Sequence, residues 1–167
     1  ADQISRRRDE MLDELDRATT LDLRAVVRAT VLPTAEVAED GPGGRHYVAF
    51  VAALGSHSEY MALLIDAYRA HTDRYLATLA RALPDLPDDV RLLRFAIARD
   101  LTNRVLGQPK GQIHQWLEFR SPGADDDIVE RLIDIVIGIF QAPIGARPPA
   151  AARSKGRLGK SLSQPVR

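Results

Sequence analysis

Residues 125–140 read DDDIVERLIDIVIGIF, and this stretch decides which kind of fold the chain can have. The acidic residues at its start favour the positive end of a helix dipole, with Asp125 as the N-cap. Apolar side chains then cover most of the helix circumference: Ile128, Val129, Leu132, Ile133, Ile135, Val136, Ile137, Ile139 and Phe140. A helix that is apolar nearly all round must be buried nearly all round.

The last helix of a small domain ordinarily keeps one face in water, so this helix needs further cover. Two late helices from each of two chains can pack as an intersubunit four-helix bundle with twofold symmetry. We therefore predict a homodimer with these interface residues: Leu92, Ala96, Ile128, Leu132, Ile133, Val136, Ile137 and Phe140. The alternative is a central helix that is wrapped by its own chain.

The rest of the chain also has helical periodicity, and no stretch has a convincing strand pattern, so we predict an all-α fold of six helices. The other five helices are predicted at residues 1–17, 21–39, 44–56, 59–83 and 87–106. Pro33 should kink or interrupt the second helix, and the DGPGG sequence at residues 40–44 should end it. Residues 107–123 are expected to form a connection, with one amphipathic turn around Ile113, Trp116 and Leu117.

The chain begins in what reads as the middle of a helix. Residues 1–17 are ADQISRRRDEMLDELDR, with no initiator Met and with an apolar stripe formed by Ile4, Met11, Leu12 and Leu15. We expect that a segment upstream is missing. The alternative is a processed N-terminus in which Asp2 is a weak N-cap.

The net charge of zero conceals an uneven distribution. Residues 142–167 contain six basic side chains and no acidic one, which leaves 17 basic and 23 acidic side chains in residues 1–141. An acidic body is a poor match for the phosphates of DNA. Residues 143–167 are rich in Pro, Ala, Gly and Ser, so we expect a disordered basic tail behind a domain at residues 18–142. Arg outnumbers Lys by 20 to 3, a bias typical of GC-rich bacterial coding sequences.

The residue types exclude several classes of protein. The chain has no Cys, which excludes disulfides, thiol catalysis and Cys-ligated metals. It has no apolar run of membrane-spanning length, and no phosphate loop, nucleophile elbow or zinc motif. We therefore expect no enzyme, no cofactor, no metal and no membrane partner. A helical enzyme that uses His57, His71 or Glu59 is the weakest alternative, because no supporting acid, base and nucleophile can be named.

Polar residues interrupt several apolar stripes. Thr30 and Thr34 lie near Val27 and Val31, and other polar side chains break the stripes of the fourth and fifth helices. A polar group that faces a core needs a partner, which is another side chain, a water or a ligand. With nearby aromatic residues they fit a mostly apolar pocket that has a few polar contacts. The predicted ligand-binding residues are Val27, Thr30, Tyr47, Phe50, Leu54, Tyr60, Met61, Leu64, Tyr68, His71, Thr72, Phe95, Arg99, Asn103 and Trp116.

The order of these segments resembles the effector-binding and dimerisation region of TetR-family transcriptional regulators. The resemblance rests on residues 5–18 (SRRRDEMLDELDRA), 22–39 (DLRAVVRATVLPTAEVAE), 43–60 (GGRHYVAFVAALGSHSEY) and 75–101 (YLATLARALPDLPDDVRLLRFAIARDL), followed by the apolar last helix. The family's helix-turn-helix is not in this chain.

The resemblance implies a cytoplasmic homodimer that binds a small, apolar effector molecule and reads operator DNA through an N-terminal domain. Residues 1–17 would be the end of the helix that connects the two domains, and residues 87–106 would be the other bundle helix. Effector binding would change the separation of the two DNA-reading domains and usually release the operator. The alternative is a stand-alone helical ligand-binding or interaction protein without a DNA-binding domain.

Overall fold

The computed structural model describes residues 2–55, 57–108, 111–121 and 127–145, without the side chains of residues 2, 58 and 61–64. The secondary-structure elements of these described residues are all α-helices, which confirms the all-α prediction. The helices are α1 (Asp2–Arg17), α2 (Leu23–Glu39), α3 (Gly41–Leu54), α4 (Ser58–Ala82), α5 (Asp88–Gly107), α6 (Gln112–Arg120) and α7 (Ile128–Gln141). Among the described residues, none of these helices is long and apolar enough to cross a membrane.

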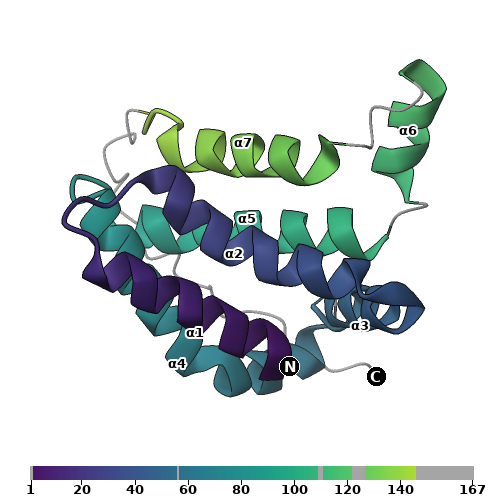
Figure 1. The fold of residues 1–167 in the computed structure, drawn as a ribbon, viewed down its shortest axis with the longest axis horizontal. Helices are drawn as coiled ribbons and strands as arrows, with labels where there is room; N and C mark the ends of the chain where they lie inside the picture. Colours follow the sequence, from purple (N-terminus) through teal and green to yellow (C-terminus); the bar gives the residue numbers. More distant parts are fainter. Residues whose placement is uncertain (1, 56, 109–110, 122–126, 146–167) are drawn as a thin grey trace, which may run out of the picture.

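Helix α2 is the central element, because it contacts α1, α3, α4, α5 and α7. In Figure 1 it lies between α1 and α7, with α5 behind it. Val26, Val27 and Val31 of α2 have no exposed surface, since their spacing places them on one wide face of the helix. The helix begins at a capped end, where the Asp22 side chain accepts a hydrogen bond of 3.2 Å from the backbone N–H of Arg24.

Pro33 lies inside α2, and the helix continues through it to Glu39. Of the two predicted effects of Pro33, the interruption is therefore wrong, and the kink stays a prediction. Proline has no backbone N–H, so the carbonyl of Ala29, four residues earlier, lacks its helical donor. The Nε of Arg8 in α1 donates to this carbonyl oxygen at 3.4 Å. A side chain from the neighbouring helix thus replaces the missing backbone donor.

The connection between α2 and α3 is shorter than the predicted turn at residues 40–44. Helix α3 already begins at Gly41, which has a φ of +83°, and Pro42 lies in its first turn. Proline suits the first turn of a helix because the N–H that it lacks would have no helical partner there. A Cβ added at Gly44 would lie 1.7 Å from the carbonyl oxygen of Val37, so the two helices meet closely at this glycine.

Helix α7 packs against α2 and α5 of its own chain. Leu132, Ile133, Val136 and Phe140 are at most 2% exposed and belong to the core. They therefore cannot form the predicted contact with a second chain, and for this face of the helix the alternative of burial by its own chain is correct. The physical reason is that the spacing of these residues places them on one arc, which α2 and α5 cover. Arg94 of α5 adds a polar link, because it donates to the carbonyl of Phe140 at 2.5 Å.

The other predicted interface residues lie nearer to the surface. Leu92 and Ala96 of α5 are exposed, and Ile128 and Ile137 of α7 are partly buried. Their role in an interface stays a prediction. The predicted N-cap Asp125 and most of the basic tail, from residue 146 onward, lie outside the described residues.

The predicted connection after α5 contains a helix of nine residues, α6. This helix stands apart from the helices around α2, beyond one end of α7 (Figure 1). Its buried His114 is joined to α5 through a hydrogen bond of 2.9 Å between Nε2 and the carbonyl oxygen of Val105. Trp116 and Phe119 are exposed, so α6 adds little to the core that surrounds α2.

Candidate ligand-binding site

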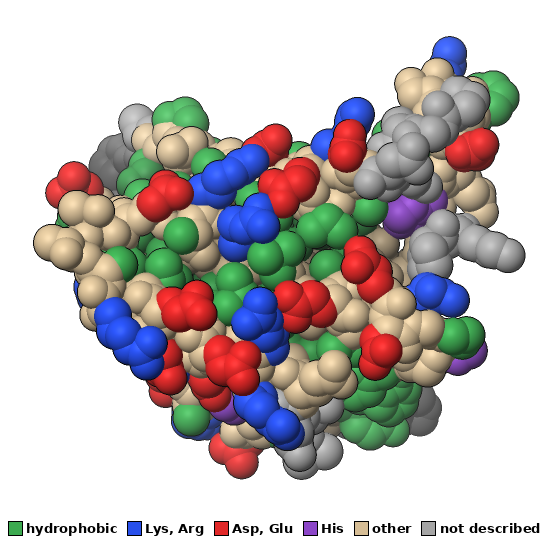
Figure 2. All heavy atoms as spheres, in the orientation of Figure 1, with side chains coloured by type: hydrophobic (Ala, Val, Ile, Leu, Met, Phe, Trp, Pro, Cys, Tyr) green, Lys and Arg blue, Asp and Glu red, His purple; other side chains and the backbone are tan. Residues whose placement is uncertain are grey.

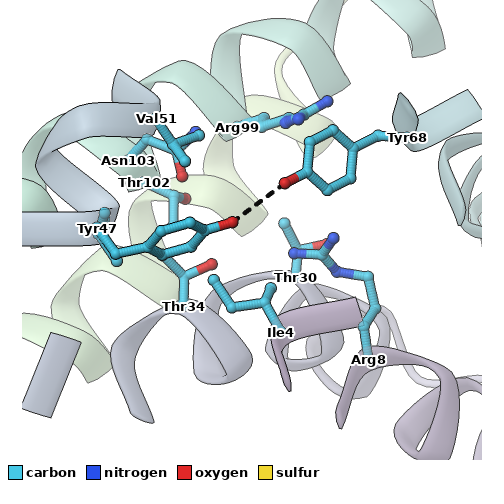
Figure 3. A pocket seen from close by; sticks show the side chains of 11 residues that line it. Ile4, Arg8, Thr30, Thr34, Tyr47, Val51, Tyr68, Arg99, Thr102 and Asn103 are labelled. Carbon is cyan, nitrogen blue, oxygen red and sulfur yellow. Dashed lines mark hydrogen bonds between the residues drawn. The ribbon is translucent and has the colours of Figure 1, made fainter. Parts of the chain in front are cut away.

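A cavity of about 30 Å³ lies where α1, α2, α3, α4 and α5 meet. Its wall consists of Ile4, Arg8, Thr30, Thr34, Tyr47, Val48, Val51, Tyr68, Arg99, Thr102 and Asn103. Figure 3 shows that the polar ends of Arg8, Tyr47 and Tyr68 converge from three different helices. A water molecule needs about 10–15 Å³ of such space, so the cavity has room for two or three waters, and a ligand of several heavy atoms requires the helices to move apart.

Two tyrosines of the cavity wall meet between α3 and α4. The hydroxyl oxygens of Tyr47 and Tyr68 are 3.2 Å apart and form a hydrogen bond, drawn as a dashed line in Figure 3. The guanidinium carbon of Arg99 lies 5.2 Å from the centre of the Tyr68 ring, which is within the range of a cation–π contact. Because these contacts join α3, α4 and α5, movement of any of these helices would disturb them.

Two arginines from different helices reach the same cavity. Arg8 extends from α1 toward Thr30, and Arg99 extends from α5 over Tyr68 (Figure 3). Burial lowers the pKa of Arg8, and the positive charge of Arg99 lowers it further. Burial also lowers the pKa of Arg99. Both effects have the same meaning: each positive charge lies in a less favourable environment than water.

Three threonine hydroxyls, those of Thr30, Thr34 and Thr102, form another part of the wall. The Oγ1 of Thr30 is buried and makes no hydrogen bond to any described residue. The hydroxyl of Tyr75 lies close to it, but the two groups do not reach hydrogen-bonding geometry. Burial raises the pKa of Tyr75 to about 12, and the proximity of Thr30 and Arg8 offsets only part of this rise. Thr30 therefore has unused hydrogen-bonding capacity beside Arg8.

Acidic residues hold α1 against α4 beside the cavity. Arg74 of α4 has side-chain nitrogens 3.5 Å from Asp9 and 3.1 Å from Asp16, and it also pairs with Asp13. The hydrogen bond from Arg74 contributes most to lowering the pKa of Asp16. His71 Nδ1 lies 3.2 Å from the carboxylate of Asp9. The two helices are thus joined by a row of ion pairs along their outer edge.

Residues 28–138 match the family model of the tetracyclin repressor-like C-terminal domain. The chain belongs to this family. Comparisons with curated proteins and with solved structures gave no match. The family match confirms the resemblance to TetR regulators, whose C-terminal domains are regulatory and bind ligands. The matched residues include the whole cavity wall of this TetR-like domain except Ile4 and Arg8, which lie on α1.

Part of the predicted ligand site does line this cavity of the TetR-like domain. The structure brings together five of the predicted residues, which are Thr30, Tyr47, Tyr68, Arg99 and Asn103. They come from α2, α3, α4 and α5, so the idea that polar residues within apolar stripes converge is supported geometrically. Their contact with a ligand stays a prediction.

The structure places other predicted residues in the core or in polar contacts outside the cavity. Val27 is fully buried among its neighbours, and Phe95 is 8% exposed with its ring centre 5.2 Å from that of Tyr75. His71 faces Asp9, which explains why a polar residue breaks the stripe of α4. Thr72 is partly buried but does not line the cavity. None of these four residues lines the cavity, and their contact with a ligand stays a prediction.

The remaining predicted residues lie away from the cavity or beyond the description. Phe50, Tyr60 and Trp116 are 59%, 44% and 57% exposed, so they face solvent in this chain. Leu54 is partly buried at the end of α3 and is not part of the wall. The side chains of Met61 and Leu64 lie outside the described residues.

Sequence reasoning missed several wall residues, above all those of α1. Ile4, Arg8 and Leu12 follow at intervals of four, so Arg8 occupies a position on the apolar stripe of α1. A charged residue on an apolar stripe is the signal that could have identified it. Thr102 was also missed, although it lies one helical turn after Arg99 on α5.

The wall is suited to binding rather than to acid–base chemistry. Its described side chains are cationic, hydroxylic, amide or aliphatic, and none is a carboxylate or an imidazole. No group of three metal-ligating side chains gathers anywhere in the described part of the chain. Its two guanidinium groups only donate hydrogen bonds, whereas its hydroxyl and amide groups can donate or accept them.

Proposed function

We propose that the chain is the ligand-sensing and dimerising part of a TetR-family transcriptional regulator, and that this regulator is a repressor. The observation that carries the proposal is the cavity at which α1 to α5 meet, within a chain that matches the TetR-like C-terminal domain. Helix α1 contributes Ile4 and Arg8 to this cavity. The family match supports the ligand-binding part of the proposal. The acidic composition of residues 1–141 favours a DNA reader outside them.

A ligand in the cavity would act on α1 directly. The cavity of about 30 Å³ must expand to admit a molecule of several heavy atoms, and α1 forms one side of it. The ion pairs of Arg74 with Asp9, Asp13 and Asp16 bind α1 to α4, so the two helices would move together. A ligand shifts the population of the possible helix arrangements only as far as it binds one arrangement more tightly than the others. Movement of α1 would transmit this shift from the cavity to the DNA-reading domain.

We further propose a homodimer through α5 and α7, on a different face from the one predicted above. Leu93 and Ile97 of α5 are 60% and 48% exposed, and Ile135 of α7 is 54% exposed. These two helices pack against each other, so their exposed apolar side chains can form one surface. A shared apolar surface of this kind is typical of an interface between chains. The buried face of α7 keeps its role in the core.

The regulator proposal is tested on the full coding sequence that contains this chain. That sequence should encode a helix-turn-helix before α1, and the full-length protein should bind DNA from the region upstream of its own gene. Fluorescence anisotropy with labelled DNA measures this binding, and the 167-residue chain is the control that should not bind. Absence of a helix-turn-helix, or equal DNA binding by the control, would refute the proposal and favour a stand-alone binding protein.

A further inference from the structure

The cavity brings two positive charges together without a negative one. Arg8 and Arg99 both line it, and no described residue of the wall is acidic. The carboxylate of Asp9 raises the pKa of Arg8 slightly, but it already pairs with His71 and Arg74. Like charges that share a small space repel one another, and this repulsion is one reason for the lowered pKa of Arg8.

Many other arginines of the chain pair with a carboxylate, whereas the buried Arg94 donates to the carbonyl oxygens of Phe140 and Ala142. Each of the following forms an ion pair with a described carboxylate: Arg7, Arg24, Arg28, Arg69, Arg74, Arg81, Arg91 and Arg104. Arg8 and Arg99 form none among the described residues. Arg8 instead has one long hydrogen bond to Ala29, and Arg99 has one aromatic ring. The hydrogen bond to Ala29 gives Arg8 a structural role, but it supplies no counter-ion. Partly buried charges without a counter-ion destabilise a fold, so the positive charges of this pair are not accounted for.

A second observation points to a ligand at the same place. Thr30 is 4% exposed, and its Oγ1 makes no hydrogen bond to any described residue. It lines the cavity beside the guanidinium of Arg8 (Figure 3). A buried polar atom usually has a partner, and an oxyanion held by Arg8 would be a suitable acceptor for this hydroxyl.

We propose that the cavity binds the carboxylate of a small organic acid, held between Arg8 and Arg99 and hydrogen-bonded by Thr30. Ile4, Val48 and Val51 form the aliphatic part of the same wall. They would contact a hydrocarbon body, which inorganic phosphate lacks. Guanidinium groups bind carboxylates through paired, charge-assisted hydrogen bonds, so two of them favour an anion strongly over a neutral analogue. This inference rests on the proposed ligand-sensing function and replaces the apolar effector with an anionic one.

The anion would also join two helices that matter for signalling. Arg8 belongs to α1 and Arg99 belongs to α5, so one carboxylate between them replaces repulsion by attraction. The effect of the ligand on α1 would therefore come from its charge, and a neutral molecule of the same shape would produce less of it.

Titration calorimetry on the 167-residue chain tests the charge of the ligand. The probes are acetate, butyrate, hexanoate, benzoate and phenylacetate, each paired with its primary amide, with inorganic phosphate as a further probe and sodium chloride at matched ionic strength. We expect at least one carboxylate to bind about tenfold or more tightly than its amide. If no carboxylate exceeds its amide, or if phosphate binds more tightly than every carboxylate, the proposal is wrong.

Matched variants test the place of binding. Arg99→Gln should weaken binding of the best carboxylate about tenfold or more, whereas Arg99→Lys, which keeps the charge, should retain part of it. Arg104→Gln removes an exposed arginine from the same helix and should leave binding unchanged. Arg8→Gln and the exposed Arg6→Gln form the same comparison on α1. Wild-type affinity in both Arg99→Gln and Arg8→Gln would overturn the site.

The outcome separates this inference from the regulator proposal. Calorimetry needs no DNA, so carboxylate binding without any DNA response of the full-length protein would refute the regulator and leave the anion site intact. A full-length protein that binds DNA but whose 167-residue chain prefers no carboxylate would do the reverse.

Discussion

At the scale of single residues, Tyr75 combines an aromatic ring that stabilises the core with a buried hydroxyl that destabilises it. The side chain is 1% exposed and its ring packs on Phe95, but its hydroxyl has no hydrogen bond to the described residues. An aromatic pair of this kind stabilises a core, whereas a buried hydroxyl without a partner destabilises it. The two contributions can be separated experimentally, because only the hydroxyl titrates.

We predict that Tyr75→Phe keeps or raises stability at neutral pH, by up to about 1 kcal/mol, because the ring stays and the unpaired hydroxyl is removed. In the folded state the pKa of Tyr75 is raised from 10.0 to about 12, because burial favours the neutral hydroxyl. The stability that depends on this neutral form is complete below pH 10 and is lost as the pH rises toward 12. The variant should therefore lose less stability over this range than the wild type. Urea unfolding, followed by circular dichroism at a series of pH values, measures the difference.

Tyr60→Phe is the matched control, because Tyr60 is 44% exposed on the same helix. It should follow the wild-type curve. An alkaline loss of stability in Tyr75→Phe that equals that of the wild type would show that Tyr75 does not govern this range.

Arg8 shows why part of the site escaped prediction from the sequence. Polar residues within the stripes of α2 and α5 indicated Thr30, Arg99 and Asn103 correctly as residues of one cavity. The sequence of α1 does not single out Arg8, because the apolar residues alone define the stripe of this helix. Pro33 frees the carbonyl of Ala29, but which helix lies beside that carbonyl depends on the tertiary fold. Sequence periodicity identifies the face of a helix, but it does not identify the neighbour of that face.

At the scale of helices, α3 and α5 come closest where small residues meet. A Cβ added at Gly107 would lie 2.8 Å from the backbone nitrogen and 2.9 Å from the Cα of Ala49. Both are backbone atoms, so a rotamer change cannot relieve the contact. The position therefore sets the distance between the two helices that carry Tyr47 and Arg99 into the cavity.

Gly107→Ala should accordingly lower the free energy of unfolding by about 1–3 kcal/mol, the usual cost of overpacking. Gly43→Ala is the control in α3, since a Cβ there meets nothing within 4 Å. It should be neutral or stabilising by up to about 1 kcal/mol, because alanine favours the helix. Urea unfolding of both variants measures the effect, and equal stability of the two would contradict the close approach.

The existence of most helices could be predicted, but the environment of each face could not. Strong periodicity in α2, α4 and α5 gave their approximate extents. α6 was missed as a helix because its nine residues form a short, weakly patterned segment. In α7 the apolar residues nearly surround the helix, so their number predicted cover on more than one side without indicating which side packs against its own chain.

At the scale of the whole molecule, charged side chains gather on the face that α1, α2 and α7 form. Figure 2 shows basic and acidic side chains intermixed over the face formed by α1, α2 and α7. Ion pairs between α2 and α7 join Arg24 to Asp134 and Arg28 to Glu130, both at 2.5 Å. Exposed pairs of this kind stabilise little, but they keep a surface soluble and align neighbouring helices. A dimer contact is therefore expected on the exposed apolar residues of α5 and α7.

The dimer proposal separates two isoleucines that lie two residues apart in the same helix. Ile135 is 54% exposed, so Ile135→Glu should convert the dimer to a folded monomer. This monomer should keep the helical content of the wild type and melt at the same temperature as the wild-type monomer. Ile133 is fully buried, so Ile133→Glu should unfold the chain, because an unpaired charge in the core costs several kcal/mol.

Sedimentation velocity and circular dichroism distinguish these outcomes, and Phe50→Glu is the control at an apolar residue of α3 that is 59% exposed. Phe50→Glu should stay dimeric, because α3 lies outside the proposed interface and an exposed site there tolerates the charge. A dimeric Ile135→Glu with native helicity would move the interface away from this face of α7. A folded, monomeric Ile133→Glu would instead return the interface to the face that the structure assigns to the core, since a charge there would then break only the contact between chains.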